Sequence, residues 1–101
     1  MNSNIGKATK FRYGNKILKG KIIDEVQLET KGKVAGKYCD VIQLIELEDG
    51  DKVIRFGFYK MDENGIWRWG RAALREELAI LKKLFKKAME KEWFKELVNK
   101  K

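Results

Sequence analysis

Two short turn signals, Asp49-Gly50 and Asn64-Gly65, constrain this chain more than any other feature of its sequence. Each one separates two runs that are rich in β-branched and aromatic residues, and Asp-Gly or Asn-Gly in that setting indicates a two-residue β-hairpin. The runs cover residues 37–48, 51–61 and 66–70, and a further strand-like run covers residues 16–30. The sequence therefore predicts an antiparallel β-meander of about four strands within residues 16–70.

From Arg71 onward the apolar residues follow the spacing of an α-helix. Lysines at 82, 83, 86 and 87 lie on the side opposite the apolar stripe, which is formed by Leu74, Leu78, Leu81, Phe85, Ala88 and Met89. We expect one long amphipathic C-terminal helix within a helical region of residues 71–98. Residues 1–15 are polar and basic and are predicted to form a loose arm, with room for one short strand near Phe11. The prediction is a single α+β domain of residues 1–101.

Composition limits the function classes that this chain can serve. Its hydrophobic content of 44% and aromatic content of 11% exclude a disordered chain. No apolar run approaches the roughly 20 residues of a membrane span, and the N-terminal residues lack the apolar stretch of a signal peptide. We therefore expect a cytoplasmic protein that does not enter a membrane.

The chain has no histidine and one cysteine, Cys39. The absence of histidine removes the usual zinc sites and every nucleophile system that depends on an imidazole base. Cys39 lies in a strand-like run beside apolar residues and is predicted to be a small buried hydrophobe. We expect no metal, no other cofactor and no enzymatic activity.

The net charge of +8 is unevenly distributed along the sequence. Residues 1–37 carry +6, residues 38–66 carry −4, and residues 67–101 carry +6 again. Two basic segments around an acidic one favour a nucleic acid, an anionic membrane or an acidic protein as partner. The alternative is that the charge serves solubility.

The lengths of the hairpin loops decide which side chains share a face of the sheet, because side chains alternate along a strand. A two-residue loop at Asn64-Gly65 places Lys60 opposite Trp69. Trp67 and Trp69 then lie under the helix, on the same face as Ile54, Phe56 and Phe58, and close the core. An odd-length loop would turn both tryptophans to the other face, where they would be available to stack on bases.

The face opposite the helix carries Arg55, Tyr59 and Arg68 in this register, with Gly57 leaving room beside the tyrosine. A two-residue turn at Asp49-Gly50 adds Leu44, opposite Arg55, and Ile42, opposite Gly57. In the first strand-like run, Leu18, Ile22, Val26 and Leu28 are expected to share one face. Lys19 and Lys21 alternate away from that face, so both lysines are expected beside Arg55. Bases stack on rings and guanidinium planes while cations neutralise phosphates, so this face is predicted to bind a single strand. The alternative is an ordinary solvated sheet face with an Arg–Tyr contact.

The run from Val53 to Arg71, together with the helix after it, resembles the single-stranded-DNA-binding domain of the transcriptional coactivator positive cofactor four and its bacterial and phage relatives. The residues that carry the resemblance are Tyr59, Met61, Asp62, Gly65, Gly70 and Arg71. The chain departs from the family pattern at Gly57, Lys60 and Ala72-Ala73, where the family has an arginine, an aromatic residue and Lys-Gly. The resemblance implies that Arg71 contacts DNA. It also implies a homodimer paired through its helices, with the sheets forming a groove for unpaired DNA.

These observations favour a small non-enzymatic protein that binds single-stranded nucleic acid, with DNA as the expected ligand. The predicted contacts are Lys19, Lys21, Arg55, Tyr59, Arg68 and Arg71, with Trp67 and Trp69 as alternative stacking residues. A protein-interaction or regulatory module, such as an accessory protein of a mobile element, is the alternative function. That module would dock its partner through the helix or the sheet.

Overall fold

The computed structural model of the protein describes residues 1–31, 36–70 and 74–99. It consists of one antiparallel five-stranded sheet and two short helices, in the order β1-β2-β3-β4-β5-α1-α2. The strands are β1 (Ala8–Tyr13), β2 (Lys16–Lys31), β3 (Lys37–Leu47), β4 (Lys52–Met61) and β5 (Trp67–Trp69), and the helices are α1 (Leu78–Ala88) and α2 (Glu92–Val98). The prediction of an α+β meander is confirmed. The extra strand, β1, comes from the segment that we expected to be a loose arm.

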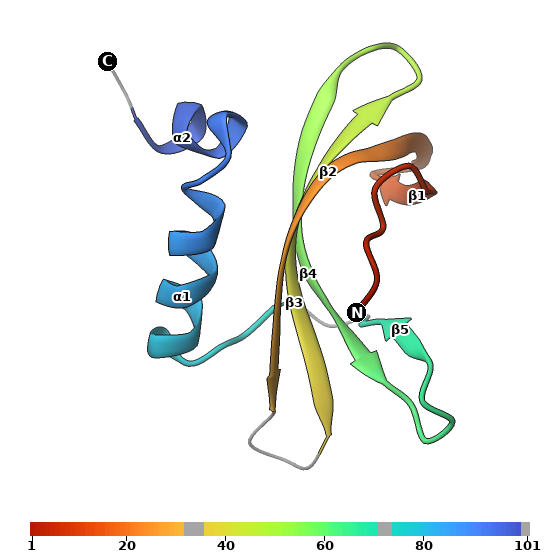
Figure 1. Ribbon diagram of the computed structural model, residues 1–101. Helices are drawn as coiled ribbons and strands as arrows, with labels where there is room; N and C mark the ends of the chain where they lie inside the picture. Colours follow the sequence, from red (N-terminus) through yellow and green to blue (C-terminus); the bar gives the residue numbers. More distant parts are fainter. Residues whose placement is uncertain (32–35, 71–73, 100–101) are drawn as a thin grey trace.

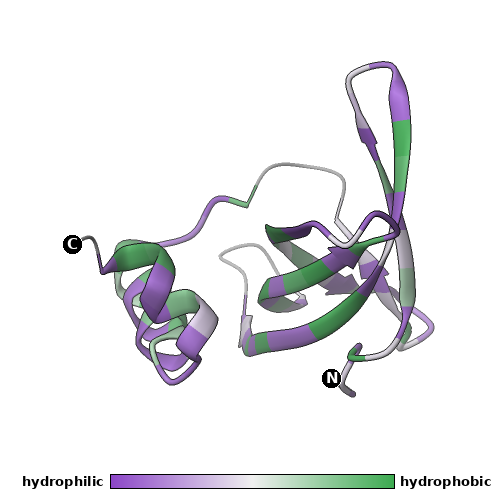
Figure 2. Ribbon diagram, turned by 90° about the horizontal axis from the view of Figure 1, so that it is seen from above, coloured by the Kyte–Doolittle hydropathy of each residue, from purple (hydrophilic) through white to green (hydrophobic). Residues whose placement is uncertain are grey.

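The sheet is strongly curled, so that β1, β5 and the N-terminal segment bend toward one side while both helices pack on the other (Figure 1). The view from above shows the same separation, with the helix pair on one side of the sheet and the N-terminus on the opposite side (Figure 2). We call the side that the helices cover the helix face, and the inner side of the curl the concave face. Every strand contributes alternate residues to the two faces.

The helix face holds the main hydrophobic core. Its buried members come from two strands and both helices, and they are Val26, Ile42, Leu84, Ala88 and Phe94. Leu28, Ile54, Leu81, Met89 and Trp93 pack around them. The predicted helical stripe is therefore only partly correct, because Leu84 and Ala88 are the residues that face the sheet while Leu78 remains 69% exposed.

The prediction of one long C-terminal helix is wrong. α1 ends at Ala88, and the chain tightens into a turn in which the amides of Glu90 and Lys91 donate to carbonyls three residues earlier. This break lets α2 fold back, so that the indole N–H of Trp93 donates to Asp24 on β2 at 2.8 Å and Lys91 forms an ion pair with the same carboxylate at 3.1 Å. Tertiary contacts thus outweigh the helical propensity of residues 89–91. No helix in the described part of the chain is long and apolar enough to cross a membrane.

Both predicted hairpins exist, but their loops contain three residues and not two. In the β4–β5 turn the amide of Gly65 donates to the carbonyl of Asp62, and Gly65 has a φ of +78°. The β3–β4 turn has the same form, because the amide of Gly50 donates a hydrogen bond to the carbonyl of Leu47 and Gly50 has a φ of +91°. A type I turn followed by a left-handed glycine gives a three-residue loop. Each loop therefore moves every residue of the following strand to the face of the sheet opposite the predicted one.

The observed registers follow from these loops. Tyr59 pairs with Trp69 and Met61 with Trp67, so both tryptophans lie on the concave face and not in the core under the helices. Gln43 pairs with Arg55 and Val41 with Gly57, so Leu44 and Ile42 lie on the helix face. The predictions that paired Lys60 with Trp69, Leu44 with Arg55 and Ile42 with Gly57 are wrong for this single reason.

A bulge in β2 accounts for a further misplacement. The register between β2 and β3 shifts between Ile22 and Asp24, so one extra residue is inserted at that point. Ile22 pairs with Ile45 on the concave face, whereas Val26 pairs with Ile42 on the helix face. The prediction that Leu18, Ile22, Val26 and Leu28 share one face is therefore wrong.

Candidate nucleic-acid interface

Three aromatic side chains, Tyr59, Trp67 and Trp69, gather on the concave face where β4 meets β5. The rings of Tyr59 and Trp69 meet edge to face, with 5.0 Å between their centroids. A Cβ atom at Gly57 would lie only 2.2 Å from the Trp69 ring, so only glycine at this position lets the indole lie on β4. Trp69 is still 37% exposed. We call these three residues the aromatic rim.

Arg55 lies beside the aromatic rim in a fixed orientation. Its guanidinium stands 4.2 Å from the centroid of the Trp69 ring, which is a cation–π contact. Two of its nitrogens donate to the side-chain oxygen of Gln43, at 3.0 and 2.7 Å, and a third donates to Thr9 at 3.2 Å. Burial lowers the pKa of Arg55, although an arginine remains charged at neutral pH. The prediction that Arg55 and Tyr59 share a face is confirmed.

A buried polar network continues from Arg55 into the centre of the concave face. Its hub is Glu25, which is 8% exposed and sits on β2 opposite Gln43. The carboxylate accepts hydrogen bonds from the side-chain amides of Gln43 at 2.6 Å and Gln27 at 2.7 Å. It also accepts two from Asn4, one from the backbone amide at 3.1 Å and one from the side chain at 2.9 Å. The network ties the N-terminal segment, β2, β3 and β4 together.

Sequence reasoning missed Glu25, Gln43 and Asn4. A signal for Gln43 was present, because this polar residue interrupts the apolar run of residues 41–45 in β3, whereas Glu25 follows Asp24 in a strand with several polar residues. A buried carboxylate requires hydrogen-bond donors, and buried amides require acceptors, so such residues are expected to find one another across adjacent strands. Asn4 carried no such signal, since it lies outside any strand.

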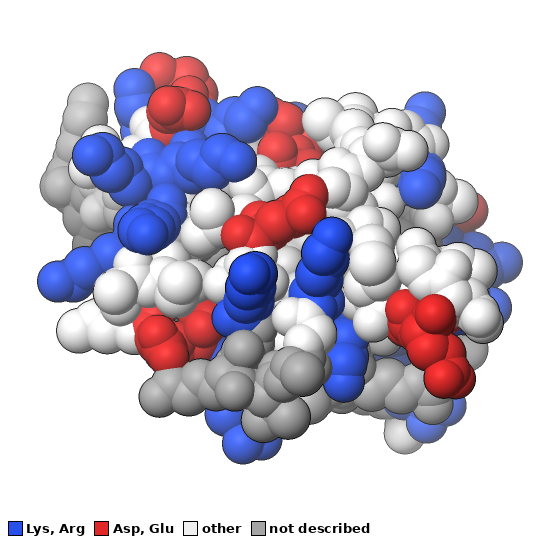
Figure 3. Space-filling view, turned by 60° about the horizontal axis from the view of Figure 1, so that its bottom comes forward, with Lys and Arg blue, Asp and Glu red and all other residues white. Residues whose placement is uncertain are grey.

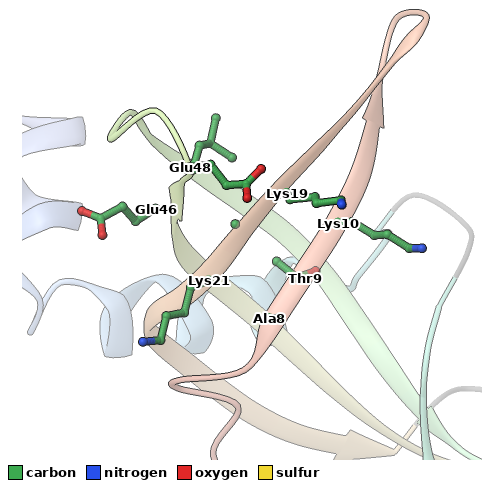
Figure 4. Close-up of a pocket in the computed structure, with 9 residues that line it drawn as sticks. Ala8, Thr9, Lys10, Lys19, Lys21, Glu46 and Glu48 are labelled. Carbon is green, nitrogen blue, oxygen red and sulfur yellow. The ribbon is translucent and has the colours of Figure 1, made fainter.

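Lys19 and Lys21 do not lie beside Arg55. Because they precede the bulge, they belong to the helix-face side of β2, where they line an open cavity of about 680 Å³ together with Lys10 and two glutamates, Glu46 and Glu48 (Figure 4). Within the described residues no ion pair joins these three lysines to a carboxylate. The lining mixes both signs of charge, so this cavity lacks the uniform field that would select an anion.

Arg68 also leaves the predicted site. It pairs with Lys60 on the helix-face side of β5, and its Nε donates to the Asp62 carboxylate at 2.9 Å. The same carboxylate accepts the backbone amides of Asn64 and Ile66, each at 2.9 Å. These bonds lower the pKa of Asp62, with the Ile66 amide as the largest cause and Arg68 the next. Arg68 thus fixes the turn, and Arg71 lies outside the described residues.

Two other titratable groups are buried in β3. Burial raises the pKa of the Cys39 thiol to about 11, so the thiol stays protonated and unreactive at neutral pH, and its predicted burial is confirmed. Asp40, on the helix face, is 2% exposed, and its Oδ2 atom has no hydrogen-bond partner among the described residues. Burial, reinforced by the nearby Glu76, raises the pKa of Asp40 to about 7.

Comparisons with protein-family models, with curated proteins and with solved structures find no match to this chain.

Proposed function

We propose that the protein binds single-stranded nucleic acid, with DNA as the expected ligand, on the concave face of its sheet. The observation that carries the proposal is the aromatic rim of Tyr59, Trp67 and Trp69 beside the guanidinium of Arg55. Stacking of a base on an aromatic ring contributes about 1–3 kcal/mol and tolerates any base, because every base has a π-face.

The electrostatics are compatible with this ligand. Two of the three aromatic residues, Tyr59 and Trp67, line a cavity together with Lys7, and the N-terminal 37 residues carry a net charge of +6. Lysines that neutralise phosphates release counterions, so affinity should fall as salt rises. Relative to the contacts expected from sequence, the proposal retains Arg55 and Tyr59, brings in both tryptophans, and assigns no base contact to Lys19, Lys21 or Arg68.

The test is a titration of a fluorescently labelled single-stranded oligonucleotide, followed by anisotropy at low and moderate salt. We expect the affinity to decrease as salt rises. Trp69→Ala should lower the affinity roughly 5- to 150-fold, which corresponds to the loss of one stacked base. Leu97→Ala, an exposed apolar residue on α2, is the matched control and should bind like the parent. Binding that is unaffected by Trp69→Ala would remove the aromatic rim from the proposal.

A second function, docking of a protein partner, is favoured by the helices. α1 contains four lysines and no acidic residue, and lysine and arginine side chains gather over the helices on the left of Figure 3. Exposed apolar side chains lie on the same two helices, at Leu78, Phe85, Leu97 and Val98. A second copy of the chain is one such partner, as the family resemblance implies. Light scattering at tens of micromolar protein would distinguish a dimer from a monomer.

A further inference from the structure

A cavity of about 360 Å³ lies on the concave face between the N-terminal segment and strands β4 and β5. Its lining combines two aromatic rings, two asparagines and a lysine, and consists of Met1, Asn2, Asn4, Lys7, Tyr59 and Trp67. Small-molecule sites in proteins span roughly 300–1,000 Å³ and pair apolar walls with a few polar groups. This cavity is therefore large enough for one planar heterocycle.

The N-terminal wall of the cavity is held in place by the sheet. Asn4 is 6% exposed and is fixed by its two hydrogen bonds to Glu25. Just beyond it, the amide of Gly6 donates to the carbonyl of Ile22 at 2.7 Å, and the amide of Ile22 donates to the carbonyl of Lys7 at 3.0 Å. A wall anchored on both sides keeps the cavity formed without a ligand, which lowers the cost of binding.

Several polar groups in the cavity retain hydrogen-bonding capacity. The indole N–H of Trp67 and the hydroxyl proton of Tyr59 have no acceptor among the described residues, although the Tyr59 oxygen accepts from Gln43 at 3.3 Å. The Lys7 ammonium donates one proton to the side-chain oxygen of Asn4 at 3.2 Å and has two more to offer. The Asn2 side chain is exposed. Donors beside aromatic rings, with a cation next to them, match a flat heterocycle that carries a phosphate.

We infer that this cavity takes up one unstacked nucleobase, with the ring against Tyr59 and Trp67 and the adjoining phosphate at Lys7. The inference rests on the proposed function and deepens it, because it separates a base-binding position from the more exposed surface of Trp69. It also gives the N-terminal segment a role, since that segment supplies the cation and the amide wall. The same chemistry is present in a free nucleotide, so the experiment includes both ligands.

The experiment compares three ligands: a single-stranded oligonucleotide of about 12 nucleotides, a strand of equal length and charge made only of abasic sites, and a nucleoside monophosphate. The readout is the NMR resonance of the Trp67 indole N–H in protein labelled at tryptophan, assigned with Trp67→Phe. Anisotropy measures affinity in parallel. We expect the base-containing strand to shift the Trp67 resonance and to bind roughly 5- to 150-fold more tightly than the abasic strand.

Variants then locate the contacts. Trp67→Phe keeps a ring and removes the N–H, so it should weaken binding of the base-containing strand and leave the abasic strand unchanged. Lys7→Ala should make the salt dependence shallower by about 0.7 in the logarithmic slope. Lys16→Ala, which removes the same charge at the far hairpin between β1 and β2, is its matched control and should have a smaller effect.

The outcomes separate the inference from the proposed function. Equal binding of the abasic strand, with an unmoved Trp67 resonance, overturns the base cavity while nucleic-acid binding stands. A shift produced by the monophosphate alone, without oligonucleotide binding, retains the cavity as a nucleotide site and overturns the proposed function. If none of the three ligands binds, both are overturned.

Discussion

The two faces of this sheet are built from alternate residues of the same strands, yet they are stabilised in different ways. Under the helices, Val26 and Ile42 meet Leu84 and Phe94 in an almost entirely apolar core. On the concave face, the neighbours of those two strand residues are Glu25 and Gln43, which are equally buried but joined by hydrogen bonds. Adjacent residues of one strand thus lie in two different environments.

The two faces depend on interactions that differ in strength and in directionality. Burial of a large apolar side chain contributes about 1.5–3 kcal/mol and places few demands on direction. A neutral hydrogen bond contributes about 0.5–1.5 kcal/mol net, but its donor and acceptor must align, and a buried one left unmade is costly. The helix face is therefore stabilised mainly by apolar burial. The concave face also buries Ile22, Val41 and Ile45, but its hydrogen bonds fix the positions of the side chains beside the candidate site.

The largest expected effect comes from the helix face. Phe94→Ala removes a ring that is 1% exposed and that packs edge to face against Phe85, with 5.5 Å between the ring centroids. It should lower the free energy of unfolding by about 3–5 kcal/mol, measured by urea denaturation. Where the variant remains folded, at low temperature, its affinity for an oligonucleotide should equal that of the parent. A loss of affinity in the folded variant would contradict the division between the faces.

Glu25→Ala tests the concave face and should lower the free energy of unfolding by about 3 kcal/mol, because it leaves buried donors without their charged acceptor and water can reach only some of them. It should also release Asn4 and open the cavity beside Trp67, which would appear as faster hydrogen exchange in residues 4–7. Glu29→Ala, four positions along the same strand, removes an exposed carboxylate that pairs with the N-terminal ammonium and is the matched control. A variant as stable as the parent would show that the network contributes little.

Asp40→Asn removes the acidic group that is buried on the helix face in β3. The pKa of Asp40 rises from an ordinary 3.8 to about 7 in the folded protein, so the folded state holds a proton that the unfolded state has released. The free energy of unfolding should therefore fall as pH rises between about 4 and 7, and Asp40→Asn should flatten this dependence. At pH 8 the variant should be more stable than the parent by about 1–3 kcal/mol, the cost of a poorly partnered buried polar atom.

Urea denaturation at several pH values would test Asp40→Asn directly. A parent protein whose stability rises across the same range would place the titrating group elsewhere, because a carboxylate stabilised by its partners has the opposite sign.

The smallest expected effect belongs to the turn that assigns the tryptophans to the concave face. Gly65→Ala places a side chain at a φ of +78° and should cost about 1 kcal/mol. Because Asp62 still fixes the turn, Trp67 and Trp69 should keep their positions. Gly50→Ala, at a φ of +91° in the equivalent β3–β4 turn, should cost a similar amount. If only Gly65→Ala disturbs the tryptophan resonances, the turn is less firmly set than its hydrogen bonds suggest.

The strand pattern, the hairpin positions and the presence of a C-terminal helical region could be predicted from the sequence, because they depend on local periodicity and turn residues. The start of that region was predicted wrongly, since residues 74–77 are not helical and α1 begins at Leu78. Which residues of each strand point to which face could not be predicted from Asp-Gly and Asn-Gly alone, since both dipeptides occur in two- and three-residue loops. A finer signal was present at the β4–β5 turn. Asp62 and Gly65 are the first and fourth residues of Asp-Glu-Asn-Gly, the preference of a type I turn.

The candidate site was predicted only in part for the same reason. Arg55 and Tyr59 lie on one strand, so their shared face requires no knowledge of loop length. The positions of Arg68, Trp67 and Trp69 depend on the turn, and those of Lys19 and Lys21 depend on the bulge near Ile22. A bulge has no sequence signal as specific as a glycine turn, and it is detected only once both neighbouring strands have been aligned.

The contact between Trp93 and Asp24 has a consequence for the order of folding. The two residues are 69 positions apart, whereas the hairpins of the meander close over a few residues each. Closing a long loop costs more chain entropy, so the sheet should assemble first and the helical end should attach after the rate-limiting barrier. Trp93→Phe should then speed unfolding and leave the refolding rate nearly unchanged, as stopped-flow kinetics would show. The C-terminal helices would then slow unfolding of the protein without affecting how fast it folds.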